Sequence, residues 1–168
     1  MNVEPRIYQQ KCVENFRNWI NTPENLASIT IPVGTGKTIT AALCLSLVPD
    51  KKILWVSHRA ELNNQALNAI TTIIPNRSIS LEMAEYKGDV NSDIIVGSVQ
   101  TIARQRKHLD GFNPDIIVVD EWHHFSENNI QYASLFKRWP NAKTLALTAT
   151  PFRASGEQLP LGNVLIQM

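Results

Sequence analysis

The sequence predicts an α/β domain in which a mostly parallel sheet carries helices on both faces. Short apolar runs alternate along the chain with longer segments of helical periodicity. Several runs are unbroken, as in Ile116-Ile117-Val118-Val119, which is typical of strands buried on both faces of a sheet. The chain has 168 residues, the size of one ordinary domain, and no internal repeat or low-complexity linker is visible.

Seven runs are expected to form strands, at residues 26–31, 52–57, 78–83, 93–97, 115–119, 143–147 and 163–167. Helices are expected at residues 6–21, 37–48 and 59–73, near 99–106 and near 129–137. The stretch 154–162 is richer in Gly, Pro and polar residues and reads as a loop. Right-handed crossovers between parallel strands place the strand ends and their loops on one edge, where ligands bind.

The composition narrows the class of protein without naming a partner. Hydrophobic residues make up 43% of the chain, enough for a core and against disorder. Lys and Arg total 16 against 15 for Asp and Glu, so net charge gives no electrostatic indication of nucleic acid. Any argument for a nucleic-acid partner must therefore come from motifs.

No window is long and apolar enough for a membrane span, and the amino terminus lacks the pattern of a secretion signal. We therefore expect no membrane partner and a cytoplasmic location by default. The two cysteines, Cys12 and Cys44, fall in apolar helical patterns and are expected to be buried, reduced thiols. No zinc-ligand spacing is present.

One turn carries the strongest chemical signal. Between the strand at 26–31 and the helix from 38 lies Pro32-Val33-Gly34-Thr35-Gly36-Lys37-Thr38. Glycines let such a turn bend tightly so that its N–H groups and the helix N-terminus face a phosphate. Lys37 is expected to reach the β- and γ-phosphates of a nucleotide, and the Thr38 hydroxyl to bind Mg²⁺. Val33, Gly34, Thr35 and Gly36 complete the predicted ATP-binding loop.

This loop departs from the general eight-residue phosphate-loop pattern, because Ile31 stands where the pattern has glycine. The alternative is a Gly-rich turn with a surface lysine. The strand before the turn, the helix after it and the intact Gly-Lys-Thr favour nucleotide binding.

An acidic pair, Asp120-Glu121, follows the most apolar strand directly. Carboxylates at the mouth of a buried strand are costly unless they meet a cation or hydrogen-bond donors. Asp120 is expected to hold Mg²⁺ through water, and Glu121 to orient or deprotonate the attacking water. A solvated strand end is the alternative, but the phosphate loop upstream makes it the weaker interpretation.

With this loop, the stretches Asp120-Glu121-Trp122-His123 and Thr148-Ala149-Thr150-Pro151 make the chain resemble lobe 1 of a DExH-type superfamily 2 helicase. It is similar to the motor subunits of type III restriction enzymes. The resemblance covers nearly the whole chain and implies one RecA-like domain over 1–168. The family does not require glycine at the position of Ile31, so that departure no longer counts against the loop.

The resemblance implies roles near the nucleotide. Arg6-Ile7-Tyr8-Gln9 is similar to the start of the family, where Gln9 would read the adenine edge with Arg6 beside it. An ordinary amphipathic helix start is the alternative, and Gln10 leaves the register open. His123 would link the nucleotide site to the next motif, in which Thr148, Ala149 and Thr150 couple hydrolysis to strand movement.

The resemblance also implies nucleic-acid contacts at two strand-to-helix junctions. Ser57, His58 and Arg59 lie at the first, and Gln100 and Thr101 at the second. Helix N-termini suit phosphate groups, although each of these residues could instead be an ordinary helix-start residue. His124 has no assigned role, and a metal shared by the neighbours His123 and His124 is rejected, because residues adjacent in sequence rarely share one ion.

We therefore expect an ATP- and Mg²⁺-binding lobe of a nucleic-acid-dependent ATPase, a helicase or translocase, with DNA favoured over RNA. Only 17 residues follow Pro151, too few for a second RecA-like lobe, so that lobe is expected in cis or in trans. A nucleotide-dependent binding or scaffold module without efficient turnover is the alternative. A small-molecule kinase is disfavoured by the Asp-Glu-Trp-His and Thr-Ala-Thr-Pro stretches.

Overall fold

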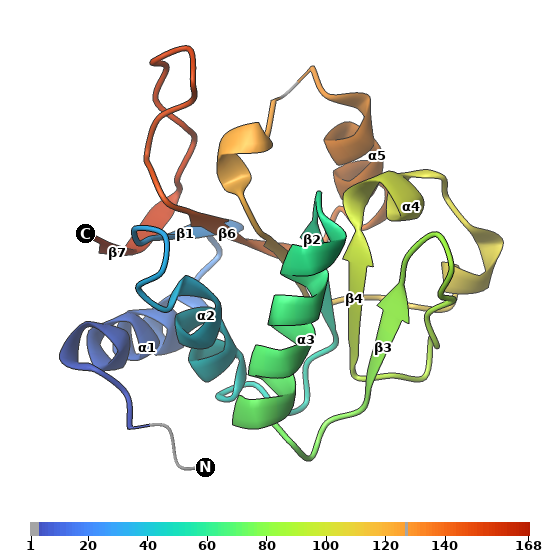
Figure 1. The fold of residues 1–168 in the computed structure, drawn as a ribbon, viewed down its shortest axis with the longest axis horizontal. Helices are drawn as coiled ribbons and strands as arrows, with labels where there is room; N and C mark the ends of the chain where they lie inside the picture. The colour runs from blue at the N-terminus through green and yellow to red at the C-terminus, as the bar shows by residue number, and fades with distance from the viewer. Residues whose placement is uncertain (1–3, 127) are drawn as a thin grey trace.

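The computed structural model describes residues 4–126 and 128–168, which form a single seven-stranded sheet with helices on both faces (Figure 1). The strand order is β3-β4-β2-β5-β6-β1-β7. Every pairing between these strands is parallel, which confirms the predicted fold class. One isolated antiparallel bridge, between Phe152 and Gln158, lies in the loop before β7.

The strands are β1 (Leu26–Thr30), β2 (Ile53–Ser57), β3 (Ile79–Glu82), β4 (Ile94–Ser98), β5 (Ile116–Val119), β6 (Lys143–Thr148) and β7 (Asn163–Gln167). The helices are α1 (Ile7–Trp19), α2 (Lys37–Leu45), α3 (Ala60–Ile73), α4 (Val99–Ala103) and α5 (Ile130–Arg138). Two short 3₁₀ helices, η1 (Lys107–Leu109) and η2 (Trp122–His124), follow α4 and β5.

All seven predicted strands and all five predicted helices are present, with ends displaced by a few residues. The helix predicted near 99–106 stops at Ala103. Gln105 has φ +51°, a left-handed conformation that an α-helix of L-residues cannot continue through. The two 3₁₀ helices carry no periodic pattern and were not predicted, because a single turn is too short to show one.

The sheet is buried from both sides by two separate layers of apolar side chains. Ile53 and Trp55 of β2 point into a core shared with α1, α2 and α3. Leu54 and Val56 point into a second core, shared with α4 and α5. Because successive strand residues face opposite sides, burial on both sides requires the unbroken apolar runs seen in the sequence.

The parallel arrangement gathers the carboxyl ends of β1, β2, β4, β5 and β6 on one edge. Strand β6 lies between β1 and β5. The Ile31 amide donates to the Thr148 carbonyl at 3.0 Å, and the Asp120 amide to the Val56 carbonyl at 2.9 Å. The phosphate loop, the acidic pair and the first strand-to-helix junction therefore start side by side.

The two cysteines lie where helix α1 packs against helix α2. Cys12 and Cys44 are buried and free, with their sulfur atoms 3.9 Å apart. This distance is almost twice a disulfide bond length of about 2.05 Å, so the prediction of buried, reduced thiols is confirmed.

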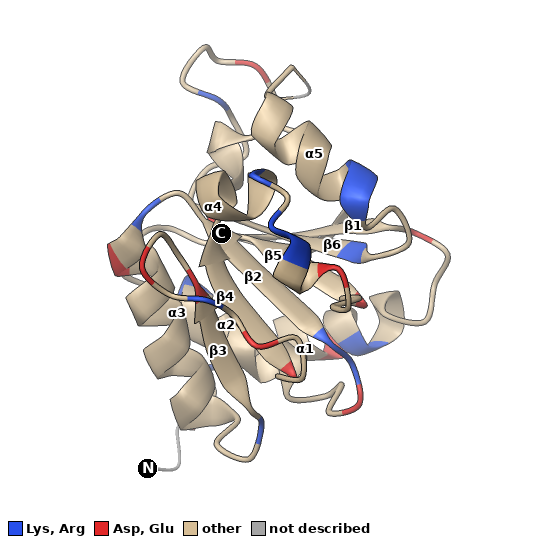
Figure 2. Cartoon of the chain, turned by 90° about the vertical axis from the view of Figure 1, so that its right-hand side faces the viewer, with Lys and Arg blue, Asp and Glu red and all other residues tan. Residues whose placement is uncertain are grey.

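Charged side chains are scattered over the surface rather than gathered by sign. Figure 2 shows basic and acidic segments interspersed on the side that it presents, in keeping with the formal net charge of +1. Among residues 4–126 and 128–168, no helix has the length and apolar character needed to cross a membrane.

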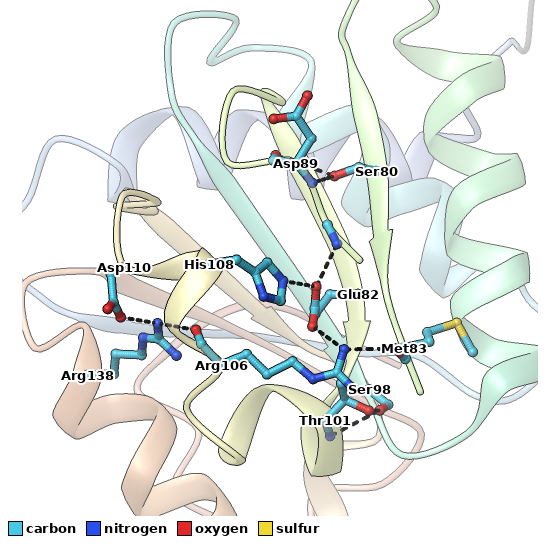
Figure 3. Close-up of polar contacts among 11 residues, drawn as sticks. Ser80, Glu82, Met83, Asp89, Ser98, Thr101, Arg106, His108, Asp110 and Arg138 are labelled. Carbon is cyan, nitrogen blue, oxygen red and sulfur yellow. Dashed lines mark hydrogen bonds and ion pairs between the residues drawn. The ribbon is translucent and has the colours of Figure 1, made fainter. Parts of the chain in front are cut away.

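A buried carboxylate ties down the β3 edge of the sheet (Figure 3). Glu82 is fully buried, and it pairs with Arg106 Nη1 at 3.1 Å and with His108 Nε2 at 2.8 Å. The Gly88 amide donates to Glu82 Oε2 at 2.6 Å. One side chain thus anchors both the loop after β3 and the segment after α4, and an inward-pointing charge also discourages pairing of the edge strand with another chain.

Glu82→Ala should lower the free energy of unfolding by about 3 kcal/mol, because it leaves Arg106 and His108 without their buried partner. Urea unfolding followed by circular dichroism measures this. Glu85→Ala, an exposed glutamate in the following loop, is the matched control and should change stability by less than about 0.5 kcal/mol. Equal stability of the two variants would contradict the anchoring role of Glu82.

A second carboxylate joins the starts of β3 and β4. Asp93 Oδ2 accepts hydrogen bonds from the Ser78 amide and hydroxyl, each at 2.9 Å. These two donors hold the pKa of Asp93 below its ordinary value of 3.8, because they stabilise the carboxylate form. The stabilisation is therefore present above pH 3.8 and is lost as the pH falls through the lower, folded-state pKa.

Asp93→Ala should consequently destabilise the chain at pH 7 and much less at pH 3. The measurement is a set of urea unfolding curves for both proteins between pH 3 and pH 7. Ser78→Ala removes the hydroxyl donor but keeps the amide donor, so it should reproduce only part of this pH dependence. A stability difference that stays constant across this range would refute the assignment.

Candidate nucleotide and nucleic-acid sites

The phosphate loop has the backbone geometry that its glycines predicted. Gly34 and Gly36 have φ of +79° and +98°, values that L-residues with a side chain rarely adopt. Gly36 caps α2 and brings no side chain to the helix N-terminus. The first N–H groups of α2 and the positive end of the helix dipole are thus available to an anion.

Lys37 and Asp120 meet across this edge of the sheet. Lys37 Nζ lies 3.3 Å from Asp120 Oδ1, and Asp120 is only 2% exposed. The Glu121 amide donates to the same oxygen at 2.9 Å. Burying a carboxylate is costly without such partners. Two motifs 83 residues apart in sequence (120 minus 37) therefore form one site.

The oxygen atoms beside this ion pair are of the kind that bind a magnesium ion. Thr38 follows Lys37 in the first turn of α2 and offers a hydroxyl, and Asp120 offers a carboxylate. Magnesium prefers oxygen ligands, keeps much of its water and needs few protein carboxylates. These two side chains are the ones that would hold Mg²⁺ beside a nucleotide.

Glu121 turns the chain sharply at the end of β5. Its φ of +54° lies in the left-handed region, which costs a residue with a side chain about 1 kcal/mol or more. The neighbouring Trp122 is buried, donates from Nε1 to the Pro160 carbonyl at 2.7 Å and stacks on Phe125 at 4.2 Å. The packing of Trp122 therefore holds Glu121 in its strained conformation.

The predicted adenine-contacting residues lie against the phosphate loop. Gln9 is buried, and its amide accepts from the Arg6 backbone at 2.9 Å and donates to the Thr40 hydroxyl at 3.1 Å. The Tyr8 hydroxyl donates to the Thr35 carbonyl of the loop. Gln10 is exposed, so Gln9 is the one of the pair that faces the site. Its contact with adenine stays a prediction.

The residues of the first strand-to-helix junction differ in exposure. Ser57 is 1% exposed, and its hydroxyl contacts Asn63 Oδ1 at 2.6 Å and the Arg59 carbonyl at 3.1 Å. Arg59 is exposed and His58 is partly exposed. The predicted nucleic-acid contacts are therefore accessible at His58 and Arg59, while the Ser57 hydroxyl orders the turn.

The second strand-to-helix junction also combines a buried residue with a more accessible one. Thr101 is 4% exposed and pairs with Ser98, which caps α4. Gln100 is partly exposed, and its amide nitrogen lies 3.3 Å from His58 Nδ1 and 3.4 Å from the His58 carbonyl. The two junctions thus form one continuous surface, joined by the contact between Gln100 and His58.

The motif after β6 forms a tight polar turn. The Thr148 hydroxyl is buried and donates to the Thr150 carbonyl at 2.8 Å. The Thr150 amide donates back to the Thr148 hydroxyl at 3.3 Å. Ala149 lies between them and is partly exposed. Strand β6 also contacts η2, which carries His123, but coupling through these residues stays a prediction.

Three side chains beside the acidic pair were not predicted to act together. His58 Nε2 lies 2.6 Å from the Tyr132 hydroxyl, and the His58 and His124 rings meet edge-to-face at 4.9 Å. His124 Nε2 lies 3.3 Å from Glu121 Oε2. Tyr132 gave no sequence signal, because an apolar position of an amphipathic helix looks the same whether or not it borders a site.

Two histidines beside the acidic pair, His58 and His123, have lowered pKa values. Burial lowers the pKa of His58 from its ordinary value, and the neighbouring His124 lowers it further. Burial and His124 also lower the pKa of His123. His123 Nδ1 is buried, and no hydrogen-bond partner is found for it among the described residues.

Candidate metal-ligand atoms of Glu121, His123 and His124 all lie within 4.8 Å of one another. The sequence argument against a metal considered the two histidines alone, whereas the fold adds a carboxylate to them. His124 Nε2 and Glu121 Oε2 also lie in direct contact, 3.3 Å apart, with no need of an ion between them.

The sequence matches a known protein family and individual known proteins. A family model described as "Type III restriction enzyme, res subunit" matches residues 2–153. The putative ATP-dependent helicase IRC3 of Saccharomyces cerevisiae is 30% identical over 134 residues, which is 74% of this chain and 19% of that protein. The chain therefore spans about a fifth of the length of this relative.

Solved structures extend the likeness to the fold. The type ISP restriction-modification enzyme LlaGI, bound to a DNA substrate mimic, has a TM-score of 0.73 at 18% identity, over 99% of this chain and 20% of that one. Saccharomyces cerevisiae Dbp5, bound to RNA and ADP BeF3, has a TM-score of 0.77 at 20% identity, over 98% and 46%. At these identities the likeness shows the RecA-like α/β fold alone.

The family model covers most of the chain and contains the phosphate loop, the acidic pair and the Thr-Ala-Thr turn. These are the motifs that the fold brings to one edge. The chain belongs to the family of type III restriction enzyme res subunits and is a RecA-like lobe of the superfamily 2 helicase type.

Proposed function

We propose that this chain binds ATP and Mg²⁺ and couples ATP hydrolysis to movement along, or unwinding of, nucleic acid. The observation that carries the proposal is the 3.3 Å approach of Lys37 to Asp120 at the N-terminus of α2, where the cap residue Gly36 has no side chain. This arrangement supplies a cation, a carboxylate and backbone donors at one point. A nucleoside triphosphate with its metal needs those three groups.

Each side chain has a distinct part in the proposed reaction. Bound Mg²⁺ would neutralise charge on the phosphates. The loop amides and Lys37 bind and orient the phosphates, and Thr38 and Asp120 hold the metal. Glu121 lies one residue beyond Asp120 with its side chain 22% exposed, so it can reach and orient an attacking water.

Nucleic acid is proposed to bind along the surface formed by His58, Arg59 and Gln100. Arg59 is the exposed cation of this surface, and α3 and α4 both begin beside it. Backbone phosphates suit an arginine and helix N-termini. Contacts of this kind carry little sequence information, as a protein that moves along a strand requires.

DNA is the proposed partner in preference to RNA. The matching family is that of a restriction enzyme subunit, and the LlaGI structure contains a DNA substrate mimic. The Dbp5 structure contains RNA; because LlaGI and Dbp5 are both similar to this chain in fold alone, the preference rests on the family match. Competition between DNA and RNA of the same sequence for the chain tests this preference.

A second RecA-like lobe, in cis or in trans, is part of the proposal. In related phosphoryl-transfer enzymes an arginine delivered to the phosphates raises the rate by roughly 10³- to 10⁵-fold. A binding or scaffold module without efficient turnover is the alternative. The intact Lys37, Asp120 and Glu121 favour the motor.

Lys37→Ala should weaken nucleotide binding by at least about tenfold, because the phosphates lose their one side-chain cation in the loop. Isothermal calorimetry with ATPγS and Mg²⁺ measures this, and circular dichroism checks the fold. Lys51→Ala removes a lysine that lies 4.0 Å from Asp115 and serves as the control. Equal affinities of Lys37→Ala and wild type would remove the basis of the nucleotide site.

Arg59→Ala should weaken DNA binding and lower the salt dependence of the affinity by about one phosphate contact. Fluorescence anisotropy at several salt concentrations gives both values. Arg17→Ala, an exposed arginine on α1, is the control and should leave the slope unchanged. Identical slopes for Arg59→Ala and wild type would exclude Arg59 as a phosphate contact.

The chain by itself should hydrolyse ATP slowly, whether or not DNA is present, because it supplies only one side of the proposed cleft. A coupled assay of phosphate release measures the rate. Adding a polypeptide with a second lobe should raise it. Strong stimulation of the chain alone by DNA would show that no second lobe is needed.

A further inference from the structure

A series of side-chain contacts, through two histidine rings, connects the proposed catalytic glutamate to the proposed nucleic-acid surface. It runs from Glu121 through His124 and His58 to Gln100. We propose that His124 is a positioning residue that couples Glu121 to occupancy of the strand-binding surface. This inference rests on the proposed function and adds a role for a histidine that the sequence motifs leave without one.

The first contact of the series is between His124 and Glu121. His124 Nε2 lies 3.3 Å from Glu121 Oε2, and the two residues sit at the two ends of one 3₁₀ turn. The turn starts from the strained backbone of Glu121, with φ +54°. Trp122, between the two residues, is buried and fixed by its packing, so a shift of the His124 ring would reach the Glu121 carboxylate through the direct contact of the two side chains.

The second contact is between His124 and His58. Their ring centroids are 4.9 Å apart in an edge-to-face arrangement. The His124 side chain is 43% exposed, which distinguishes it from a core residue that only fills space. A ring packed against His58 on one side and a carboxylate on the other is placed to respond to either.

The third step fixes His58 to the nucleic-acid surface. The Gln100 amide nitrogen donates to His58 Nδ1 at 3.3 Å, which leaves the Nε2 proton of a neutral ring to donate to the Tyr132 hydroxyl at 2.6 Å. Tyr132 is buried and also packs edge-to-face against His58. Because both ring nitrogens of His58 are engaged, a phosphate that draws Gln100 or His58 outward must also move the ring that faces His124.

Energetic coupling of this kind passes through packed side chains that can take two arrangements. The backbone reinforces the route, because the Asp120 amide donates to the Val56 carbonyl at 2.9 Å, two residues before His58. The distance between the two sites is therefore spanned by neighbouring residues on β2, β5 and η2. His124 contacts the members of both sites and belongs to neither.

The test measures how strongly nucleotide and DNA affect each other's binding to the chain. DNA affinity is determined by anisotropy with and without saturating ATPγS and Mg²⁺, in EDTA-washed, transition-metal-free buffers. For wild type we expect ATPγS to change DNA affinity by about fivefold or more, a common size for coupled sites. For His124→Ala we expect ATPγS to change DNA affinity by less than about twofold.

Two further variants separate positioning from simple packing. His124→Gln keeps a donor near the position of Nε2 and should restore at least half of the wild-type coupling on a logarithmic scale. His108→Ala makes the same substitution at a histidine whose partner is Glu82, and it should leave the coupling at the wild-type value. DNA affinity without nucleotide should be close to wild type in all three variants, because His124 and His108 are not proposed to touch DNA.

The outcomes are distinct. Loss of coupling in His124→Ala together with its recovery in His124→Gln supports the inference. Equal coupling in wild type and His124→Ala overturns it while leaving the proposed function standing, and so does a wild type that binds both ligands without coupling. A wild type that binds neither ATPγS nor DNA overturns the proposed function and this inference with it.

Discussion

The pairing of Lys37 with Asp120 is the constraint on which the rest of this site depends. Lys37 is the first residue of α2, which follows β1, and Asp120 follows β5 directly; strand β6 lies between β1 and β5. A carboxylate that is 2% exposed is stable there only with a cation close by. The pairing also fixes where a phosphate would have to enter, between the lysine and the α2 N-terminus. The sheet order, the glycines of the loop and the packing of Trp122 all serve to keep these two groups 3.3 Å apart.

The architecture separates tasks by face and by edge. Two apolar layers bury the sheet from both sides and supply stability, whereas the polar chemistry is confined to the loops at the carboxyl edge. Glu82 shows that a buried charge can also serve stability away from this edge, since it holds two loops through Arg106, His108 and Gly88. Strain is placed at the site itself, at Glu121, and the packing of a neighbouring tryptophan compensates for it.

The proposed motor activity agrees with this separation between the apolar layers that stabilise the sheet and the polar loops at its carboxyl edge. The proposed nucleotide site and the proposed nucleic-acid surface are adjacent because parallel strands end together. His58 and His124 lie at the seam between them. The His124 side chain contacts both His58 and Glu121 above the sheet, and coupling between two ligands can pass through packed side chains of this kind.

The sequence by itself determined the fold class, all seven strands, the phosphate loop and the acidic pair. Those features are local: unbroken apolar runs report two-sided burial, and Gly34, Gly36 and Lys37 occur in a fixed order whose geometry follows from backbone sterics. Only the tertiary structure decided which predicted residues are accessible. Ser57, Gln9 and Thr101 share motifs with exposed neighbours, yet each is buried and hydrogen-bonded within the chain. It also decided the grouping of His58, His124 and Tyr132, because contacts between residues 58 and 132 depend on the packing of α5 against the sheet and leave no mark in local spacing.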